Sequence, residues 1–495
     1  MLVLNDPDTP GEQLVYHGTY TTSMALRPDG SVLWQVPTGL QLPARAPGER
    51  DYTHAWGMNY LPQADAVLSV TMDGYVVAHD RRRGRALLQR PFRLPGAPAP
   101  VVRRPPWWIS APANRATDAA FGRTIDDLGL FTAITDVIFG NGFMIANFDA
   151  VDPNTGRIYI AATAPDAPDA RDGASDGVSR DGAVYLLELH AAAAGWHELR
   201  MVRDFPFEGG TGSTPTVSPN SDRVMVSDEN GNVIALDAEL NELWRVNVGA
   251  QVAASIAVSS DNAELYAVTQ HDVIKLIDRG DRAEIAWRAR LDAYPGFANF
   301  NALTPTITAN GIAISVGAGR SIGANHLMHR VGVGRLDRET GALRSFAEGR
   351  EESIAVTSLG PDGGYYLANS PVRRAVTRGL FGDRLPPLVG GIQRFRPVRL
   401  DLVVRDAACA GAARARNAQG IASDHPDSAR DDRAQIGVLL RQALSALAVA
   451  AQRGELDDAI RTAVESDLRS AQSSLSTPSF EALAAPLTRV CDRFP

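Results

Sequence analysis

The residues best suited to chemistry lie in five short segments that are widely separated along the chain. They are His54, Trp56 and Asn59 in the first segment, Asn141 and Asn147 in the second, Thr211 in the third, Asn299 and Asn301 in the fourth, and Glu351 and Glu352 in the fifth. His54 is the best general acid–base candidate, because only histidine titrates near neutral pH without a special environment, and Glu351 could orient its ring. Together, such groups would suit a polar small molecule or a divalent metal such as calcium.

Three further motifs could bind a partner or a metal. Trp107 and Trp108 follow two prolines and two arginines; if exposed they would form a lid or docking surface, and the alternative is that they pack the surrounding insertion onto the fold. His326 and His329 could place two metal ligands on one side of a helical turn, although a surface loop is favoured. The Asp-rich segment from Pro165 to Gly182 lacks EF-hand spacing and is expected to be a solvated loop.

Composition excludes several classes of protein. The chain has 495 residues, 44% of them hydrophobic, which fits a globular protein with a sizeable core. Its net charge of −8 gives no general attraction to nucleic acid. Lys275 is the only lysine beside many arginines, so arginine-rich stretches say little about function. No Ser-His-Asp spacing, nucleophile elbow or phosphate loop indicates a particular reaction.

No transmembrane segment is expected. The most apolar run, Gln435 to Gln452, carries Arg441 and has polar residues on one side, which is typical of a packed helix. The N-terminal segment has no basic start and no long apolar stretch, so it is not expected to be a signal peptide.

Internal repeats indicate the elements that position the candidate residues. From Thr214 the chain reads TPTVSPNSDRVMVSDENGNVIALDAELNELWRV, four alternating apolar–polar strands joined by turns rich in Asn, Asp, Gly or Pro. Similar segments start at about Met58, Phe148, Ala254, Leu303 and Ile354, and an incomplete copy opens the chain. The ends of the third strands fall at Arg27, Asp80, Glu188, Asp237, Asp278, Asp337 and about Arg394.

These markers predict an all-β fold, a seven-bladed β-propeller followed by a small C-terminal helical region. A strand from after Arg396 would complete the first blade and close the ring. An eighth blade within residues 97–140 stays possible. In a propeller the innermost strands line a central tunnel, and the five polar segments lie near the starts of those strands. The alternative is that water fills the tunnel and the polar groups satisfy strand ends.

Segments such as VIALDAELNELWRV and MALRPDGSVLWQV resemble the repeat of the pyrroloquinoline-quinone-type (PQQ-like) β-propellers. Trp34 and Trp244 lie nine residues after Ala25 and Ala235, as that repeat requires. Trp287 is displaced by two residues, and Leu87 and Arg344 replace the tryptophan elsewhere. The resemblance covers roughly residues 14–400 and implies that each tryptophan docks between neighbouring blades.

The resemblance leaves the function open, because this superfamily holds dehydrogenases, assembly scaffolds and other enzymes. The propeller region lacks the adjacent cysteine pair of the quinone dehydrogenases and any CxxCH haem site, so bound PQQ is not expected. The favoured function is a ligand-binding or protein-interaction module of the cell envelope. The alternative is a metal-assisted hydrolase, lyase or lactonase acting at the tunnel mouth, and the third is a divergent quinone-dependent oxidoreductase.

A helical region follows the repeats. The expected propeller spans residues 1–405, with insertions at about 97–140, 164–182, 317–331 and 370–390, and residues 406–495 form a linker and helices. The Ala-rich stretch past Asp401 is predicted to be extended. Helices are predicted from Ser428 to Gln452, from Asp457 to Ser474, and from Thr477 onward. The first of these has an apolar face, expected to pack on the propeller or on a partner, made of Ile436, Leu439, Leu440, Ala443, Leu447 and Ala450.

The two cysteines, Cys409 and Cys491, bracket the helical region. A bond between them would close a long loop and contribute about 4 kcal/mol in the chain-entropy model. Two unpaired thiols are equally compatible with the sequence. Pairing would indicate work outside the cytoplasm, so the expected location is periplasmic or secreted, and otherwise cytoplasmic.

Overall fold

The computed structural model divides the chain into two compact units, Met1–Pro361 with Tyr365–Phe395, and Asp362–Gly364 with Arg396–Pro495. The structure describes residues 2–9, 11–44, 53, 55–96, 107–121, 149–165, 181–210, 213–252, 254–269, 271–290, 304–308, 311–322, 325–349, 358–359, 365–368, 392–395, 400–422, 426–452 and 456–494. Each unit is treated by itself below.

The first unit is mostly β. Its described strands form six four-stranded antiparallel sheets and one three-stranded sheet, and in every sheet neighbouring strands follow one another in the chain. The strands of the first three sheets are β1 (Leu2–Asn5), β2 (Gln13–Gly18), β3 (Thr22–Leu26), β4 (Val32–Pro37), β5 (Ala55–Leu61), β6 (Ala66–Thr71), β7 (Tyr75–Asp80), β8 (Phe92–Arg93), β9 (Asp149–Val151), β10 (Ile158–Thr163), β11 (Gly182–Ala191) and β12 (His197–Phe207).

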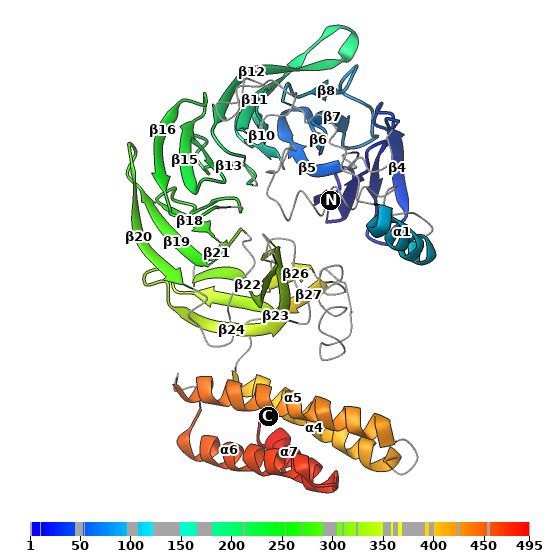
Figure 1. Cartoon of the computed structure of the whole chain (residues 1–495), viewed down its shortest axis with the longest axis vertical. Helices are drawn as coiled ribbons and strands as arrows, with labels where there is room; N and C mark the ends of the chain where they lie inside the picture. Colours follow the sequence, from blue (N-terminus) through cyan, green and yellow to red (C-terminus); the bar gives the residue numbers. More distant parts are fainter. Residues whose placement is uncertain are drawn as a thin grey trace. The chain divides into compact units, whose positions relative to one another are not determined.

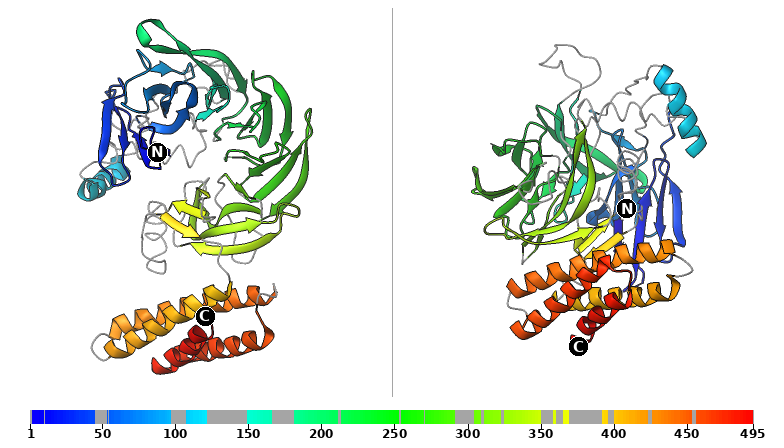
Figure 2. Two further views of the ribbon diagram at one scale, coloured as in Figure 1. Left: turned by 180° about the vertical axis from the view of Figure 1, so that it is seen from behind. Right: turned by 60° about the horizontal axis from the view of Figure 1, so that its bottom comes forward.

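The remaining sheets repeat the plan. Their strands are β13 (Thr216–Val217), β14 (Arg223–Ser227), β15 (Asn232–Asp237), β16 (Glu242–Asn247), β17 (Ala257–Val258), β18 (Glu264–Val268), β19 (Asp272–Asp278), β20 (Ala283–Arg290), β21 (Thr306–Thr308), β22 (Gly311–Ile322), β23 (Asn325–Leu336), β24 (Leu343–Gly349), β25 (Ser358–Leu359), β26 (Tyr365–Ala368) and β27 (Ile392–Phe395). In Figures 1 and 2 the sheets follow one another in chain order, and β16, β20 and β24 lie on the outside while β13 and β21 lie on the inside.

Apolar side chains bury the faces between consecutive sheets. Separate clusters of buried residues join the first sheet to the second, the second to the third, and so on to the sixth. The cluster between the second and third sheets, for example, includes Leu68 and Val76 from one and Ile160 and Leu187 from the other. Four-stranded antiparallel sheets that pack face to face in succession are the arrangement of β-propeller blades.

Tryptophans at the positions that the repeat predicts contact the next sheet and form hydrogen bonds with it. The indole Nε1 of Trp34, on β4, donates a hydrogen bond of 3.2 Å to the carbonyl oxygen of Arg81, in the turn after β7. The ring lies against Gly84, which has a φ of 70°; a Cβ added there would lie 2.5 Å from the ring. Both its positive φ and the close approach of the ring therefore favour glycine at this position.

The same contact recurs along the chain. Trp244 donates to the carboxylate of Asp278 at 3.1 Å, and Trp287 donates to the carbonyl oxygen of Arg338 at 3.0 Å. Trp287 pairs with Lys275 beside a register shift, as Trp244 pairs with Ala235. The extra residues that displace Trp287 in the sequence thus lie in the turn before β20. Trp287 occupies the same position in its sheet as Trp244 does in the sheet before it.

Lys275 is buried where the first and fourth sheets carry Ala25 and Ala235. Its Nζ donates to Glu264 Oε1 at 2.6 Å and to the carbonyl oxygen of Arg338 at 3.0 Å. The Arg338 guanidinium donates to the other oxygen of Glu264 at 2.6 Å. Burial alone would raise the pKa of Glu264, but hydrogen bonds from Lys275, Tyr266 and Arg338 hold it below its usual value. A charge-paired network therefore bridges the fifth and sixth sheets.

One sequence-based expectation about the ends of the first unit needs correction. The first sheet takes its first strand from the N-terminal residues, because β1 pairs with β2. Its four strands are complete without a strand from after Arg396, and a helix begins at Leu400. The insertion at 317–331 lies in two 12-residue strands, β22 and β23, which lengthen a hairpin.

The second unit is helical and contains α4 (Leu400–Ile421), α5 (Pro426–Gln452), α6 (Asp458–Ser473) and α7 (Glu481–Arg493). The predicted extended stretch past Asp401 is wrong, because it forms α4. The apolar face of α5 does not need the propeller as its cover. Ile436, Leu440, Ala443 and Leu447 belong to a buried cluster shared with α4, α6 and α7.

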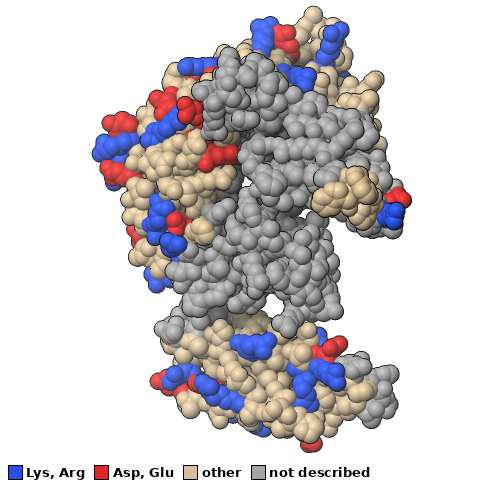
Figure 3. Space-filling view, viewed as in Figure 1, with Lys and Arg blue, Asp and Glu red and all other residues tan. Residues whose placement is uncertain are grey.

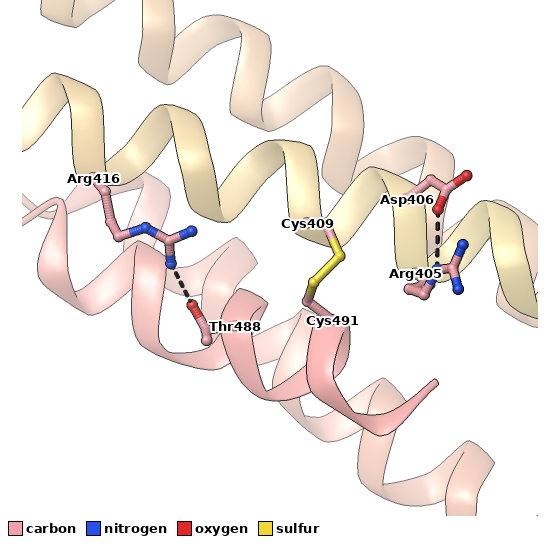
Figure 4. Close-up of a disulfide and its surroundings, with 6 residues drawn as sticks. All are labelled: Arg405, Asp406, Cys409, Arg416, Thr488 and Cys491. Carbon is pink, nitrogen blue, oxygen red and sulfur yellow. Dashed lines mark hydrogen bonds and ion pairs between the residues drawn. A yellow bond between two sulfur atoms is a disulfide. The ribbon is translucent and has the colours of Figure 1, made fainter. Parts of the chain in front are cut away.

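A disulfide joins Cys409 on α4 to Cys491 on α7, with a Cα–Cα distance of 4.9 Å (Figure 4). This settles the pairing that the sequence left open. Near it, Arg416 donates a hydrogen bond of 3.0 Å to the hydroxyl of Thr488, a second link between these two helices. Asp457 caps α6 by accepting hydrogen bonds from the backbone N–H groups of Ala459 and Ile460.

Candidate functional site

Hydrogen bonds join the first strands of neighbouring sheets, or the residues just before them. The Asn59 side-chain amide on β5 donates to the carbonyl oxygen of Asp149, the first residue of β9, at 3.1 Å. Thr214 N donates to Ser255 Oγ, and Ser255 N donates to Thr304 Oγ1, each at 3.1 Å. These contacts link the second sheet to the third, and the fourth through the fifth to the sixth. The topology therefore places first strands that are distant in sequence beside one another.

Asn59 acts as a link between strands. Besides its bond to the Asp149 carbonyl oxygen, its Oδ1 accepts a hydrogen bond of 2.9 Å from the backbone N–H of Tyr60. Both polar atoms of the Asn59 side chain thus bond to backbone groups. This agrees with the alternative interpretation, in which the polar groups of the five segments satisfy the backbone instead of binding a ligand.

The Asp149 side chain is the most unusual polar group in this neighbourhood. The residue is only 5% exposed, and among the described residues neither of its carboxyl oxygens has a hydrogen-bond partner. It pairs with Ile160 across the sheet, so it shares the face that packs against the second sheet. Burial raises the pKa of the Asp149 carboxyl to about 7, because an ionised carboxylate would be uncompensated there.

A carboxyl group with such a pKa exchanges its proton near neutral pH. It could therefore donate or accept a proton, or take up a positive charge, at the inner edge of the third sheet. Sequence reasoning missed this residue. A signal was present: Asp149 lies three residues before Asp152, and the corresponding positions of the next two repeats hold Pro215 and Ile256, which carry no charge.

Most of the other predicted site residues lie outside the described part of the chain. These are His54, Asn141, Asn147, Thr211, Asn299, Asn301, Glu351 and Glu352. Trp56 lies on β5, although its side chain is not among those described. Whether these residues form one site with Asn59 stays a prediction.

Trp107 and Trp108 begin the helix α1 (Trp107–Phe121). Trp107 is 79% exposed and Trp108 is 61% exposed, more than any other tryptophan that the structure describes. The sequence left open whether the two tryptophans are exposed or pack the insertion onto the fold, and in the structure they are exposed. Two adjacent exposed indoles on one helical turn are a large apolar surface for a folded protein.

The histidine pair His326 and His329 lies on the strand β23, so the helical turn on which their metal-binding geometry depended is absent. Within the described residues no group of three or more His, Cys, Asp or Glu side chains could hold a metal ion. Most of the Asp-rich segment of residues 165–182 lies outside the described residues. Among the described helices none is long and apolar enough to cross a membrane.

Comparison with known proteins gives distant structural likeness only. No protein-family model matches the sequence, and no curated protein matches it. The β-propeller domain of Cps50 (Swd1) from Myceliophteria thermophila is similar over 75% of this chain and 93% of its own, with 10% identity and a TM-score of 0.41. BamB from Moraxella catarrhalis is similar over 74% of this chain and 94% of its own, with 10% identity and a TM-score of 0.39. The β-propeller interpretation rests on this chain's own sheets and their packing.

Proposed function

We propose that this chain is a β-propeller binding module of the cell envelope that engages a protein or a small polar ligand. The observation that carries the proposal is the exposure of Trp107 and Trp108 at the start of α1. Tryptophan is the residue type that most often dominates binding energy at an interface. Burying water-exposed indoles against a partner lowers the free energy by removing apolar surface from water, so a surface of this kind indicates a docking role.

The finer features of the fold belong to the same proposal. Seven blades with a PQQ-like repeat are supported by the succession of described sheets and by the docking of Trp34, Trp244 and Trp287 onto the next sheet. A periplasmic or secreted location is supported by the bond between Cys409 and Cys491, because structural disulfides persist in oxidising compartments.

A site-specific photo-crosslinker placed at position 107 or 108 tests the binding role in the native host. Val32, which is 52% exposed on β4, is the matched control position. We expect one dominant adduct from 107 and 108 that is absent from position 32. Equal, scattered adducts at all three positions would show that the tryptophans mark no binding surface.

An enzyme acting at the inner strand ends is the second candidate, and Asp149 is the observation that favours it. A buried carboxyl with a pKa of about 7 is suited to general acid–base work in a hydrolase, lyase or lactonase. The test compares hydrolysis of a panel of esters and lactones by the wild-type chain and by Asp149→Asn. Turnover that vanishes in this variant, but persists in Asp152→Asn, would support the enzyme; equal turnover in both variants would remove Asp149 from the mechanism.

A further inference from the structure

The helix α1 has one exposed face. The residues that the structure describes as exposed on this helix are Trp107, Trp108, Ala111, Pro112, Arg115 and Asp118. Successive residues are rotated by about 100° around a helix, so these six positions fall within roughly 140° of one another. Among the described elements, none packs extensively against α1. The face is therefore open to a second molecule.

The two ends of this face differ in chemistry, and small side chains separate them. Two indoles occupy the first turn, whereas the Arg115 guanidinium and the Asp118 carboxylate lie in later turns. The exposed residues between them are Ala111 and Pro112. In Figure 3 the surface over α1 is mainly tan, with one basic and one acidic patch at its end. Small side chains in the middle let another helix approach α1 closely.

The charges on the face cancel, so they favour neither an anionic nor a cationic partner. The whole insertion is also neutral, since residues 97–140 contain four arginines and four aspartates. Among the described residues, none forms a hydrogen bond or an ion pair with the Arg115 or Asp118 side chain. A guanidinium stacks favourably on the face of an indole, and an indole N–H donates to a carboxylate. One end of the face is therefore complementary to the other end.

Helical geometry turns this complementarity into a specific pairing. The face is centred between Ala111 and Pro112, and Trp108 precedes that point by as many residues as Arg115 follows it. Two copies of α1 that pack antiparallel about a two-fold axis at this point place Trp108 of one copy over Arg115 of the other. Trp107 then lies within about 3 Å, measured along the helix, of Asp118 of the second copy. A parallel pair would instead bring identical charges together, which is unfavourable.

We propose that α1 pairs antiparallel with α1 of a second copy of this chain, so that the protein forms a two-fold dimer. At 79% and 61% exposure, the two indoles of one copy leave about 300–400 Å² open to water. With the rest of the face, two copies bury about 1,000 Å² in total, which is the lower limit for a specific interface. The dimer is therefore reversible, with a Kd in the micromolar range. The inference rests on the proposed docking role of the tryptophans and names their partner.

Sedimentation velocity of the purified full chain, over concentrations from about 1 to 200 μM, tests the dimer. The wild-type chain should pass from monomer to dimer across this range. The Trp107→Ser, Trp108→Ser variant should raise the Kd at least about tenfold for each tryptophan removed, and emission from the remaining tryptophans reports that it is folded. Arg115→Glu should weaken the dimer more than Arg115→Lys, which keeps a cation over the ring. The matched control Val32→Ser, Leu33→Ser removes exposed apolar side chains from β4 and should dimerise like wild type.

Cross-linking with a short bismaleimide tests the antiparallel arrangement. Cys409 and Cys491 are bonded to each other and no other cysteine exists, so an introduced cysteine is the only thiol. Ala111 lies beside the two-fold axis, and Ala111→Cys should give a covalent dimer. Asp118→Cys is the control on the same exposed face, because its two copies lie about 20 Å apart in the antiparallel pair and should not be joined.

Three results would each overturn the inference: a wild-type chain that stays monomeric over the whole series, a tryptophan variant that dimerises as tightly as wild type, or equal cross-linking from Ala111→Cys and Asp118→Cys. The photo-crosslinking experiment separates this inference from the proposed function. A single adduct from positions 107 and 108 with the mass of two chains would support both. One dominant adduct with a different protein, together with a monomeric wild-type chain, would leave the proposed function standing and refute this inference alone.

Discussion

Replacing Asp149 by asparagine should stabilise the first unit at high pH. The neutral amide has nearly the shape of the carboxyl, so the substitution removes the charge with little change in packing. In wild type the pKa of Asp149 rises from its usual 3.8 to about 7 on folding. The folded state therefore holds this proton more tightly than the unfolded state. The stability due to the protonated carboxyl is complete below about pH 4 and is lost as pH rises to about 7.

The size of the effect follows from the shift of about 3 pKa units between 3.8 and about 7. At about 1.4 kcal/mol for each unit, ionised Asp149 lowers the free energy of unfolding by about 4 kcal/mol at pH 8. Between pH 5 and pH 8 the loss is about 2.5 kcal/mol. An unpaired buried amide has its own cost of about 1–3 kcal/mol, but that cost does not change over this pH range. The pH dependence of the difference between variant and wild type therefore isolates the charge.

Urea unfolding followed by tryptophan fluorescence is the assay. All seven tryptophans lie between Trp34 and Trp287, so the signal reports the first unit only. Between pH 5 and pH 8 the free energy of unfolding of Asp149→Asn should rise by about 2.5 kcal/mol relative to that of wild type.

The matched control is Asp152→Asn, on the same segment. Asp152 is 1% exposed, yet hydrogen bonds from Thr155, Ser221 and Asn154 outweigh its burial and hold its pKa below its usual value. This variant should be less stable than wild type at pH 8. If Asp149→Asn showed no pH-dependent gain, or were itself less stable at pH 8, a compensated Asp149 carboxylate would be established and the reasoning from burial refuted.

Three further outcomes follow from single contacts. Gly84→Ala should lower the free energy of unfolding by about 2–3 kcal/mol, because the new Cβ meets the Trp34 ring. The control Gly30→Ala, at a similar φ of 84° but with open space around the Cβ, should lower it less. Equal losses of stability in the two variants would argue against the ring contact. Cys409→Ser with Cys491→Ser should cost the helical unit about 4 kcal/mol, measured by circular dichroism at 222 nm in urea, and an unchanged midpoint would contradict it. Asp457→Ala should cost about 1 kcal/mol in the same assay through loss of the α6 cap, and Asp457→Asn should restore most of it; no recovery would mean that the cap is not the cause.

The sheets could be predicted from the sequence because strands and tight turns are determined by residues that are close together in the chain. Alternation of apolar and polar residues places one face of each strand in a core, and Asn, Asp and Gly supply the turns. The region Thr214–Val246 shows this most clearly, since the predicted strands from Arg223 to Val246 fall where β14, β15 and β16 lie. The register of Trp287 could also be anticipated from the repeat, apart from the extra turn residues.

The errors arose where packing partners decide the structure. The stretch that forms α4 was interpreted as extended because it has few large apolar residues, although Ala408, Ala412 and Ala415 follow helical spacing and are all buried. Small side chains let helices approach closely, so the core of the second unit is largely alanine on this side. The first strand of the first sheet, Leu2–Asn5, could not be assigned because it does not share the repeat.

The candidate site could be predicted only in part, for a related reason. Asn59 was selected for its polarity and position, and it lies within β5, where its amide bonds to the backbone of Asp149; its role in a site stays a prediction. Asp149 was not selected, because its chemistry comes from burial against the second sheet, and that burial depends on residues far away in the chain.

The burial of Lys275 also determines how the protein reacts with reagents that modify amines. Its side chain is only 6% exposed and its Nζ is held by Glu264 and by the Arg338 carbonyl oxygen. It is the only lysine in the sequence, so amine-directed reagents meet no exposed lysine side chain on the folded protein. Succinimidyl esters should therefore leave this side chain unmodified in the folded protein and label it after unfolding. Acetyltransferases and amine-directed cross-linkers would find no lysine side chain to modify until the fifth and sixth sheets separate.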